Sequence, residues 1–365
     1  MAVADLDQDP LCPGCDDVVV AVPKSNAASI RIGHADGTFN TPIAVPVPRP
    51  IAVATADCDG DGDEDVFVLG LGGDLHVLEN QLNDSTSGAF VEAAGSPIST
   101  GRGGTFVLAR DYTGAALDLD GDANHDLVVT DAKRGSVVLH GQGGCAFTVD
   151  STVLPAAVSA GAGPFDASAG LDLALLSRHP SPGAISILRN DGSGGFPSVC
   201  PGTGCFQEQV RPRVGALVVH DFNGNGVADV VVSNSVARPG APSIQGLEVA
   251  TGQGGGVLSA FNGYGSGGAG AAGVAVDQFA GTMFSDIVVV NRRSGTLGSL
   301  VGTSDFATFD DVVTTPVGRH PVAVAAGQFN SGTDSFLDVV VLYDRSSLAL
   351  CLGDGAGGFS CTPTP

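Results

Sequence analysis

The residues best suited to chemistry are aspartates that occupy alternate positions of short loops. The clearest loop, at 57–65, places acids at positions 1, 3, 5 and 9, a glycine that permits a sharp turn at position 6, and a backbone carbonyl at position 7. Such a loop can wrap around one hard cation, and so many oxygen ligands favour Ca²⁺ over Mg²⁺, which keeps more waters. The predicted calcium ligands of this loop are Asp57, Asp59, Asp61, Asp63 and Asp65.

Three further loops repeat the pattern with differences. The loop at 118–126 has Ala123 where glycine is expected, which costs strain if φ is positive there. The loop at 221–229 replaces two acids by amides and is expected to bind calcium more weakly, and the first loop of the chain carries an insertion with two cysteines. The predicted ligands are Asp118, Asp120, Asp122, Asn124 and Asp126; Asp221, Asn223, Asn225, Val227 and Asp229; and Asp5, Asp7, Asp9 and Asp17.

The loops differ from an EF-hand, which needs Glu at position 12. That position is Val68, Val129 or Val232, each inside an apolar run typical of a strand. The loops therefore join two strands. The alternative to a metal site is that these aspartates only form Asx turns with the backbone.

Each loop ends in an aspartate followed by an apolar run, and we call this residue the closing aspartate. The seven closing aspartates are Asp17, Asp65, Asp126, Asp172, Asp229, Asp286 and Asp338. About 25 residues further on, a Gly-rich hairpin ends in Phe, as at 33–39, 190–196 and 353–359. The repeats that close at Asp172, Asp286 and Asp338 lack most of the other ligands, and whether they bind metal is left open.

Each repeat holds about four short β-prone runs, which is the content of one propeller blade. The sequence therefore predicts an all-β protein, a seven-bladed β-propeller of four-stranded blades, with every metal loop on one face. We expect a single domain over 1–365, with blades near 1–48, 49–100, 101–154, 155–212, 213–270, 271–318 and 319–365. The alternative is a sandwich of unrelated β-hairpins.

Composition limits the function classes. The net charge is −23, with 39 Asp and Glu against 16 Lys and Arg, which argues against a nucleic-acid partner. No run of 18 apolar residues predicts a membrane-spanning helix, so no membrane insertion is expected. We expect a secreted or cell-surface protein whose signal segment is not in this chain, which is trimmed or a fragment of something longer.

The eight cysteines favour an oxidising compartment. Three pairs lie close in sequence beside Gly/Pro turns and are predicted to form local disulfides: Cys12 with Cys15, Cys200 with Cys205, and Cys351 with Cys361. A redox role for Cys12-Pro-Gly-Cys15 would need a helix after it, and no helical pattern follows. Cys58 and Cys145 either pair or are free.

The loop and repeat pattern resembles the FG-GAP/VCBS repeat family, which includes the propeller of integrin α subunits and certain fungal propeller lectins. The D-x-D-x-D-G-x-x-D loop at 57–65 carries this resemblance, which covers nearly the whole chain. The resemblance implies structural calcium held between the first two strands of a blade, with the acids named above as ligands.

No catalytic cluster is visible in the sequence. The seven histidines are scattered, and His125 and His220, in or beside the loops, are predicted to face solvent. No G-x-S-x-G motif and no phosphate-binding Gly-Lys-Ser/Thr motif occurs. Together with the fold, these observations predict a non-enzymatic extracellular recognition or adhesion module that presents its loop faces to a protein or glycan ligand.

Two alternatives remain for the function. One is a lectin-type carbohydrate-binding propeller, which the lack of Trp and the presence of only three Tyr disfavour. The other is a polysaccharide-degrading enzyme such as a lyase, because some members of the family it resembles are carbohydrate lyases. The ligand's identity and the oligomeric state are open.

Overall fold

The computed structural model describes residues 1–9, 12, 14–83, 90–101, 104–168, 170–178, 183–197, 205–210, 214–235, 245–304, 307–330, 334–344 and 346–363. All regular elements in these ranges are β-strands. Among the described residues, no helix is long and apolar enough to cross a membrane.

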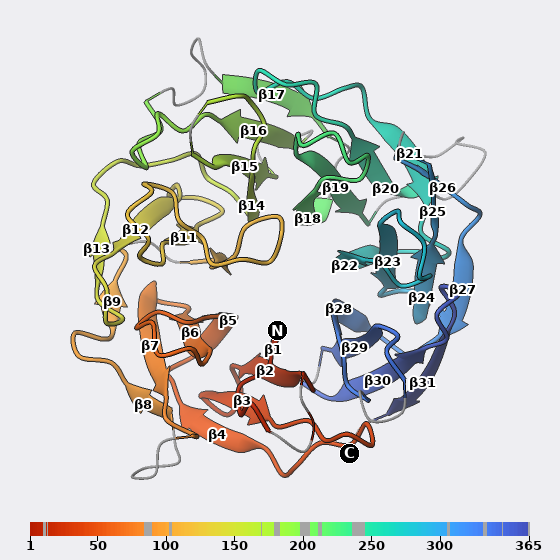
Figure 1. Cartoon of the computed structure of the whole chain (residues 1–365), viewed down its shortest axis with the longest axis horizontal. Helices are drawn as coiled ribbons and strands as arrows, with labels where there is room; N and C mark the ends of the chain where they lie inside the picture. Colours follow the sequence, from red (N-terminus) through yellow and green to blue (C-terminus); the bar gives the residue numbers. More distant parts are fainter. Residues whose placement is uncertain are drawn as a thin grey trace.

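Apart from one two-stranded hairpin, the described strands form seven antiparallel sheets, and these sheets are arranged as blades around one axis (Figure 1). Within each blade the strands follow one another in chain order, from the axis outwards. This arrangement confirms the predicted all-β, seven-bladed propeller.

The first four blades have the following strands. Blade 1 holds β1 (Ala2–Ala4), β2 (Asp17–Val22), β3 (Ala27–Arg31) and β4 (Ile43–Pro46); blade 2 holds β5 (Pro50–Ala56), β6 (Asp65–Gly70), β7 (Asp74–Asn80) and β8 (Phe90–Glu92), with β9 (Ile98–Ser99) paired to β7; blade 3 holds β10 (Phe106–Leu108), β11 (Leu127–Thr130), β12 (Val137–Gly141) and β13 (Phe147–Val149); blade 4 holds β14 (Ser159–Gly163), β15 (Asp172–Ser177), β16 (Ala184–Leu188) and β17 (Cys205–Gln209).

The last three blades follow the same plan. Blade 5 holds β18 (Val214–His220), β19 (Asp229–Asn234), β20 (Gln245–Ala250) and β21 (Asn262–Gly265); blade 6 holds β22 (Ala271–Asp277), β23 (Asp286–Asn291), β24 (Thr296–Leu300) and β27 (Val313–Pro316), with the small hairpin of β25 (Gly302–Ser304) and β26 (Thr308–Phe309) before its last strand; blade 7 holds β28 (Pro321–Gly327), β29 (Asp338–Tyr343), β30 (Leu348–Gly353) and β31 (Phe359–Pro363).

The second strand of each blade explains the continuous apolar runs in the sequence. Successive side chains of a strand point to opposite faces of the sheet. In β6, Val66 and Val68 pack into the core shared with blade 1, whereas Phe67 and Leu69 pack into the core shared with blade 3. Because both faces are buried, such a strand is apolar at every position rather than alternating with polar residues.

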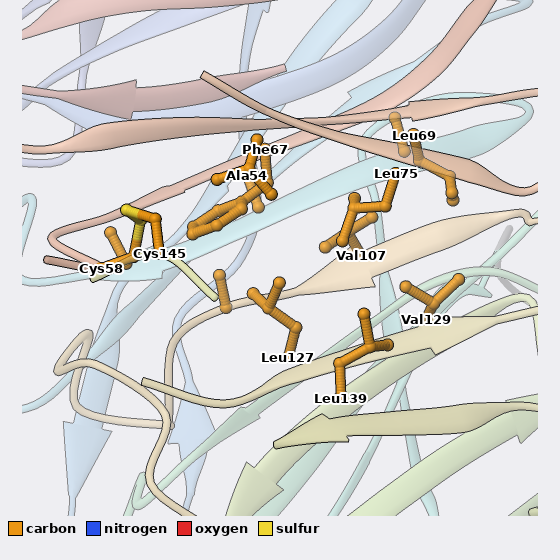
Figure 2. Packing of buried hydrophobic residues seen from close by; sticks show 14 of the residues in the cluster. Ala54, Cys58, Phe67, Leu69, Leu75, Val107, Leu127, Val129, Leu139 and Cys145 are labelled. Atoms are coloured by element: carbon orange, nitrogen blue, oxygen red, sulfur yellow. A yellow bond between two sulfur atoms is a disulfide. The ribbon is translucent and has the colours of Figure 1, made fainter. Parts of the chain in front are cut away.

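The molecule accordingly has no single core. Its buried apolar residues form seven clusters, each between two neighbouring blades. Figure 2 shows the cluster between blades 2 and 3, where Phe67 and Leu69 face Val107, Leu127 and Leu139. The stability of one blade therefore depends on its two neighbours, as in other repeat proteins.

Three disulfides connect cysteines of the described residues. The predicted local pairs Cys12–Cys15 and Cys351–Cys361 are confirmed. Cys58 pairs with Cys145, 87 residues away, and this bond connects the first loop of blade 2 to the last loop of blade 3 (Figure 2). The predicted Cys200–Cys205 pair involves Cys200, which lies outside the described residues.

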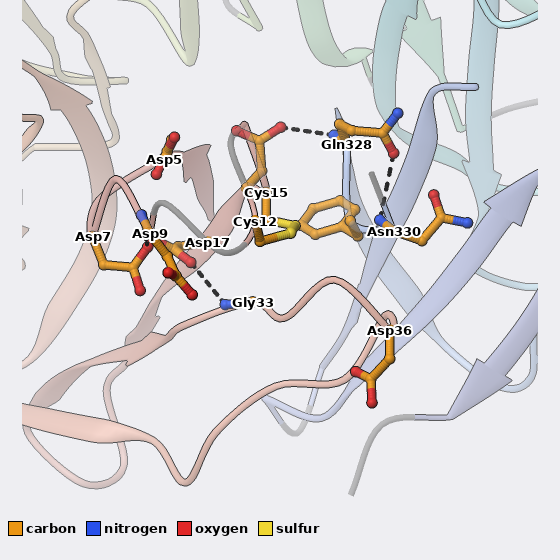
Figure 3. The surroundings of a disulfide bond; sticks show 12 residues. Asp5, Asp7, Asp9, Cys12, Cys15, Asp17, Gly33, Asp36, Gln328 and Asn330 are labelled. Atoms are coloured by element: carbon orange, nitrogen blue, oxygen red, sulfur yellow. Dashed lines mark hydrogen bonds between the residues drawn. A yellow bond between two sulfur atoms is a disulfide. The ribbon is translucent and has the colours of Figure 1, made fainter. Parts of the chain in front are cut away.

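The ring closes between blade 7 and blade 1 without exchange of strands, since β1–β4 and β28–β31 are separate sheets. Two reciprocal hydrogen bonds connect them: the Asp16 N–H donates to the Gln328 carbonyl (2.8 Å), and the Gln328 N–H donates to the Asp16 carboxylate (2.7 Å; Figure 3). The rings of Phe39 and Phe329 pack edge to face across the same boundary, with centroids 5.7 Å apart.

The antiparallel order gives the propeller two distinct faces. We call the side with the connections between first and second strands and between third and fourth strands the loop face. The side with the connections between second and third strands, and from one blade to the next, is the turn face. All seven loops that end in a closing aspartate join a first to a second strand, so they share the loop face.

Candidate metal centres on the loop face

The closing aspartates are buried and hydrogen-bonded in all seven blades. Each is at most 1 % exposed and lies at the start of a second strand, or directly before it in the case of Asp126. In each blade, one carboxylate oxygen accepts a backbone N–H from the start of the preceding loop. The other oxygen accepts the N–H of the residue that ends the third strand or lies two positions beyond it.

Blade 2 illustrates the geometry. Oδ2 of Asp65 accepts the N–H of Cys58 (2.9 Å), and Oδ1 accepts the N–H of Asn80 (2.8 Å). One buried side chain thereby satisfies two backbone groups that neither the loop nor the strand ladder could pair, and leaving a buried N–H unpaired costs about 1–3 kcal/mol.

The residue that donates from the third strand was missed by the sequence analysis. It is glycine in five blades, at Gly33, Gly141, Gly252, Gly302 and Gly353. A Cβ at any of these positions would lie 2.2–2.5 Å from the carbonyl oxygen of the residue before the closing aspartate. Aligning the seven repeats on the closing aspartate would have revealed the position.

In the remaining two blades the same position is asparagine. The Asn80 Nδ2 donates to the Leu6 carbonyl of blade 1 (2.7 Å), and the Asn190 Nδ2 donates to the Leu119 carbonyl of blade 3 (2.7 Å). These asparagines therefore add a polar contact to the preceding blade.

The loop at 57–65 brings its first three acids together. Carboxylate oxygens of Asp57, Asp59 and Asp61 all lie within 4.8 Å of one another. Asp57 accepts the N–H groups of Gly60 (2.7 Å) and Gly62 (3.0 Å), which curls the loop around these oxygens. Such turns form with or without a cation, so they do not by themselves identify a metal site.

Asp63 is the observation that fits a cation. Its side chain is only 8 % exposed, and its Oδ1 is buried without a hydrogen-bond partner among the described residues. Burial, followed by the nearby Asp61 carboxylate, raises the pKa of Asp63 to about 7. A buried acceptor beside three further carboxylates is the donor set that Ca²⁺ prefers. The residues of this loop therefore fit calcium.

The loop at 118–126 adopts the same conformation. Oxygens of Asp118, Asp120 and Asp122 are within 4.8 Å of one another. Ala123 has φ = 67°, as anticipated for a position where glycine is expected. Asn124 donates from its backbone N–H and its Nδ2 to Asp122 (both 2.7 Å), which directs its side chain at the loop acids.

The other two predicted loops differ in their donors. In blade 1, Asp5, Asp7 and Asp17 bring oxygens within 4.8 Å of one another, and Asp9 follows in the same turn, donating its N–H to Asp7 (3.2 Å; Figure 3). In blade 5, Asp221 accepts N–H groups from Asn225 and Gly226, and the Val227 N–H donates to the Asn225 side chain. The Asn223 side chain accepts the N–H of Asn225 (3.1 Å).

The histidines beside the loops differ from the prediction. His125 is 6 % exposed and stacks on Phe67 of blade 2, so the prediction that it faces solvent was wrong. Burial lowers its pKa to about 4. His220 is half-buried and its Nε2 lies 2.6 Å from the Ser285 Oγ of blade 6. Residues in the loops thus also pack between blades.

His140 was not singled out by the sequence. It lies on β12, and its Nδ1 is 3.4 Å from Asp120 and 3.7 Å from Asp126. It is placed to interact with the carboxylates of the 118–126 loop from outside that loop. Cys58 and Cys145 also lie near Asp65, but their sulfurs are engaged in the disulfide.

Burial raises the pKa of several closing aspartates despite their backbone hydrogen bonds, which act in the opposite direction. The values are about 7 for Asp17, Asp65 and Asp229, and about 6 for Asp172 and Asp338. Because the native state holds these protons to a higher pH than the unfolded chain, the stability they contribute is present below about pH 4 and is lost as the pH rises through the native pKa.

A pocket of about 710 Å³ opens beside these loops. Asp5, Gln8 and Asp9 line it from the first loop, and Gly62 and Glu64 line it from the loop at 57–65. Arg110 of blade 3 completes the wall and forms an ion pair with Glu64.

The fold and the loops define a seven-bladed β-propeller with acid-rich loops on one face. Residues 14–68, which include the loop at 57–65, match the family model of the FG-GAP-like repeat. The predicted resemblance to the FG-GAP/VCBS repeat family is thereby confirmed by these residues and by the propeller fold. No curated protein sequence matches the chain significantly.

Several solved structures are similar in fold. They include the BP39L lectin from Burkholderia pseudomallei (18 % identity, 100 % of this chain and 98 % of the lectin, TM-score 0.67) and BBS1N in complex with ARL6DN (12 %, 95 % and 90 %, TM-score 0.59). A candidate 6-phosphogluconolactonase from Bacteroides uniformis is also similar (12 %, 95 % and 94 %, TM-score 0.60). At these identities the similarity shows the fold alone.

The closing aspartates can be tested in blade 4, whose loop lacks most of the predicted metal ligands. Asp172 accepts N–H groups from Phe165, Asp166 and Asn190. In Asp172→Asn an NH₂ group replaces one carboxylate oxygen and cannot accept the backbone N–H groups that this oxygen accepted. We therefore expect the free energy of unfolding to fall by about 1–3 kcal/mol. Urea denaturation in EGTA measures it.

The matched control is Asp74→Asn, at an exposed position that starts β7. We expect it to change stability by less than about 0.5 kcal/mol. Equal, small effects of both substitutions would contradict the structural role assigned to the closing aspartates.

Proposed function

We propose that the chain is a secreted or cell-surface recognition module that binds a protein or glycan ligand without catalysis, and that calcium in its loops stabilises the binding face. The pocket beside the first two loops carries this proposal. Its walls come from the predicted calcium loops of blades 1 and 2, so a cation in either loop would fix the shape of the pocket.

The chemistry of the pocket suits a polar ligand. Arg110 is held rigidly: its Nε donates to the Thr55 carbonyl (3.1 Å), its Nη1 to the Gly114 carbonyl (2.6 Å), and its Nη2 pairs with Glu64. Gln8 is exposed, and its Nε2 donates to the Gly62 carbonyl, which leaves its Oε1 directed away from that bond. Fixed polar groups of this kind orient a ligand by hydrogen bonds.

A binding role is preferred to an enzymatic one because the acidic side chains of the pocket already have structural partners or belong to a predicted metal loop. Asp5 and Asp9 belong to a predicted calcium loop, Glu64 pairs with Arg110, and Asp16 accepts the Gln328 N–H at the ring closure. One similar solved structure is a lectin and another was solved in complex with ARL6DN, which supports a glycan or a protein as the ligand class.

Calcium is expected to reverse the pH dependence of stability. Without calcium, the ionised loop carboxylates repel one another and the buried aspartates lose their protons, so the Tm should fall as the pH rises from 4 to 7. Calcium binds only the ionised native loops and adds about 2.7 kcal/mol per site at a hundredfold excess over Kd. Calorimetry in calcium and in EGTA measures both effects.

Asp59→Ala should remove part of the gain from calcium, whereas Asp311→Ala, at an exposed position outside the predicted loops, should retain it. Magnesium should stabilise less, because the loops offer more protein oxygens than its octahedron takes. Identical melting curves in calcium and EGTA at pH 7 would show that the loop aspartates form Asx turns and bind no metal.

The ligand can be sought with a glycan array and a panel of extracellular proteins, each probed in calcium and in EGTA. We expect binding that is strongest in calcium and that Gln8→Ala weakens severalfold. Gln253→Ala is the matched control, since Gln253 lies on the loop face of blade 5, away from the pocket. If neither EGTA nor Gln8→Ala changes the affinity, the ligand binds outside this pocket.

A further inference from the structure

The basic residues of the chain are not distributed evenly between the two faces. Eleven of the 16 Lys and Arg lie among the described residues, and only Arg31, Arg110 and Arg189 of these are on the loop face. The other eight are all exposed on the turn face: Lys24, Arg49, Lys133, Arg134, Arg178, Arg292, Arg293 and Arg319. A protein with a net charge of −23 thus keeps most of its described cations on one side, opposite the acidic loops.

Three of these arginines converge on one pocket. A pocket of about 250 Å³ lies where the turns of blades 4 and 6 flank the first strand of blade 5. It is lined by Arg178, Arg292 and Arg293, by Ser235, and by small residues of β18 and β22. None of the described residues that line it is acidic.

The backbone around the pocket holds the arginines in place. The Arg178 Nε donates to the Val214 carbonyl of blade 5 (3.1 Å). This bond uses only Nε and does not involve the two terminal guanidinium nitrogens. Backbone N–H groups of Arg292 and Arg293 donate to the Gly270 and Ala269 carbonyls (2.9 and 3.0 Å). A Cβ on Gly270 would lie 3.0 Å from the Arg293 Cγ, so glycine leaves room for the stem of that arginine.

The described residues compensate the three charges poorly. The Arg292 Nη2 is 3.5 Å from Asp344, in a pair whose side chains are 53 % and 37 % exposed, which is a weak contact. Within the described part of the chain, no acid pairs with the Arg178 or Arg293 side chain. Arg319 lies near the turn that carries Arg292 and Arg293. The Val317 N–H donates to the Gly295 carbonyl of that turn (2.9 Å), which holds the segment of Arg319 beside it. Like charges gathered in this way favour the binding of an anion.

We propose that Arg178, Arg292 and Arg293 form a binding pocket for the carboxylate or sulfate group of an acidic glycan. Guanidinium groups match the planar oxygens of such groups with paired hydrogen bonds. The ligand class rests on the proposed function, whereas the site itself is separate from the loop-face pocket.

The lining disfavours the other polyanions. Among the described residues that line it, none has an aromatic side chain on which nucleic-acid bases could stack. None of the exposed large apolar side chains of the described residues lines it, so these residues offer no side chain to insert into a lipid surface. The acidic loop face would moreover repel any polyanion that approached from that side, so binding is confined to the turn face.

The test uses the whole chain with calcium present and measures binding of a heparin hexasaccharide and of an oligogalacturonate by titration calorimetry near physiological salt. Arg292→Gln/Arg293→Gln should weaken binding of at least one of them by about tenfold or more, the loss expected for charge-assisted hydrogen bonds. Arg49→Gln/Lys133→Gln, which removes two charges from the same face outside the pocket, should weaken it less than about threefold.

Circular dichroism and the Tm show that each variant is folded, and the arginines concerned are exposed. Equal losses of affinity in both double variants would mean that the ligand is attracted by the whole face, and would contradict a binding site at this pocket. Failure of the wild type to bind either oligosaccharide, or tighter binding of a single-stranded DNA of equal charge, would overturn the ligand class. Calcium-dependent stability and loop-face binding would survive these outcomes, so failure here is distinguishable from failure of the proposed function.

Discussion

The buried carboxylate of the closing aspartate is the interaction on which the propeller depends. In every blade it accepts an N–H from the start of the loop and an N–H at the end of the third strand or two residues beyond it. It thereby fixes the first loop to the second and third strands of its own blade. Because the seven apolar cores lie between blades rather than within them, a blade that lost this connection would also disturb both neighbouring cores.

The same constraint shapes the loop face. With the last aspartate of each loop held by the backbone, the earlier acids at 57–61 and 118–122 are brought close together, and Asp63 is buried with an oxygen that has no partner. Such a concentration of like charge is unfavourable in isolation, which is why we propose that a cation binds there. The basic turn face is the counterpart of this arrangement, because ligands of opposite charge can then meet different sides of one rigid ring.

Much of the fold was predictable because its signal is local and occurs seven times: a closing aspartate, an apolar second strand and a Gly-rich hairpin. Features that depend on neighbouring blades could not be predicted in this way. Gly141 and Gly353 look like ordinary turn residues until the approaching carbonyl is seen. His125 stacks on Phe67 of another blade, and Cys58 lies 87 residues from Cys145. The metal ligands remain a prediction, for which the unpartnered Asp63 oxygen is the structural support.

Native-state amide hydrogen exchange tests the central role of the closing aspartates most directly. The N–H groups of Leu6, Cys58, Leu119 and Phe222 lie in loops outside the strands, yet each donates to a closing aspartate. We expect these amides to exchange as slowly as the amides of the second strands, since they open only when the blade opens. Exchange at the rate of exposed loop amides would contradict this role, because the carboxylates would then not hold the loops to the blades.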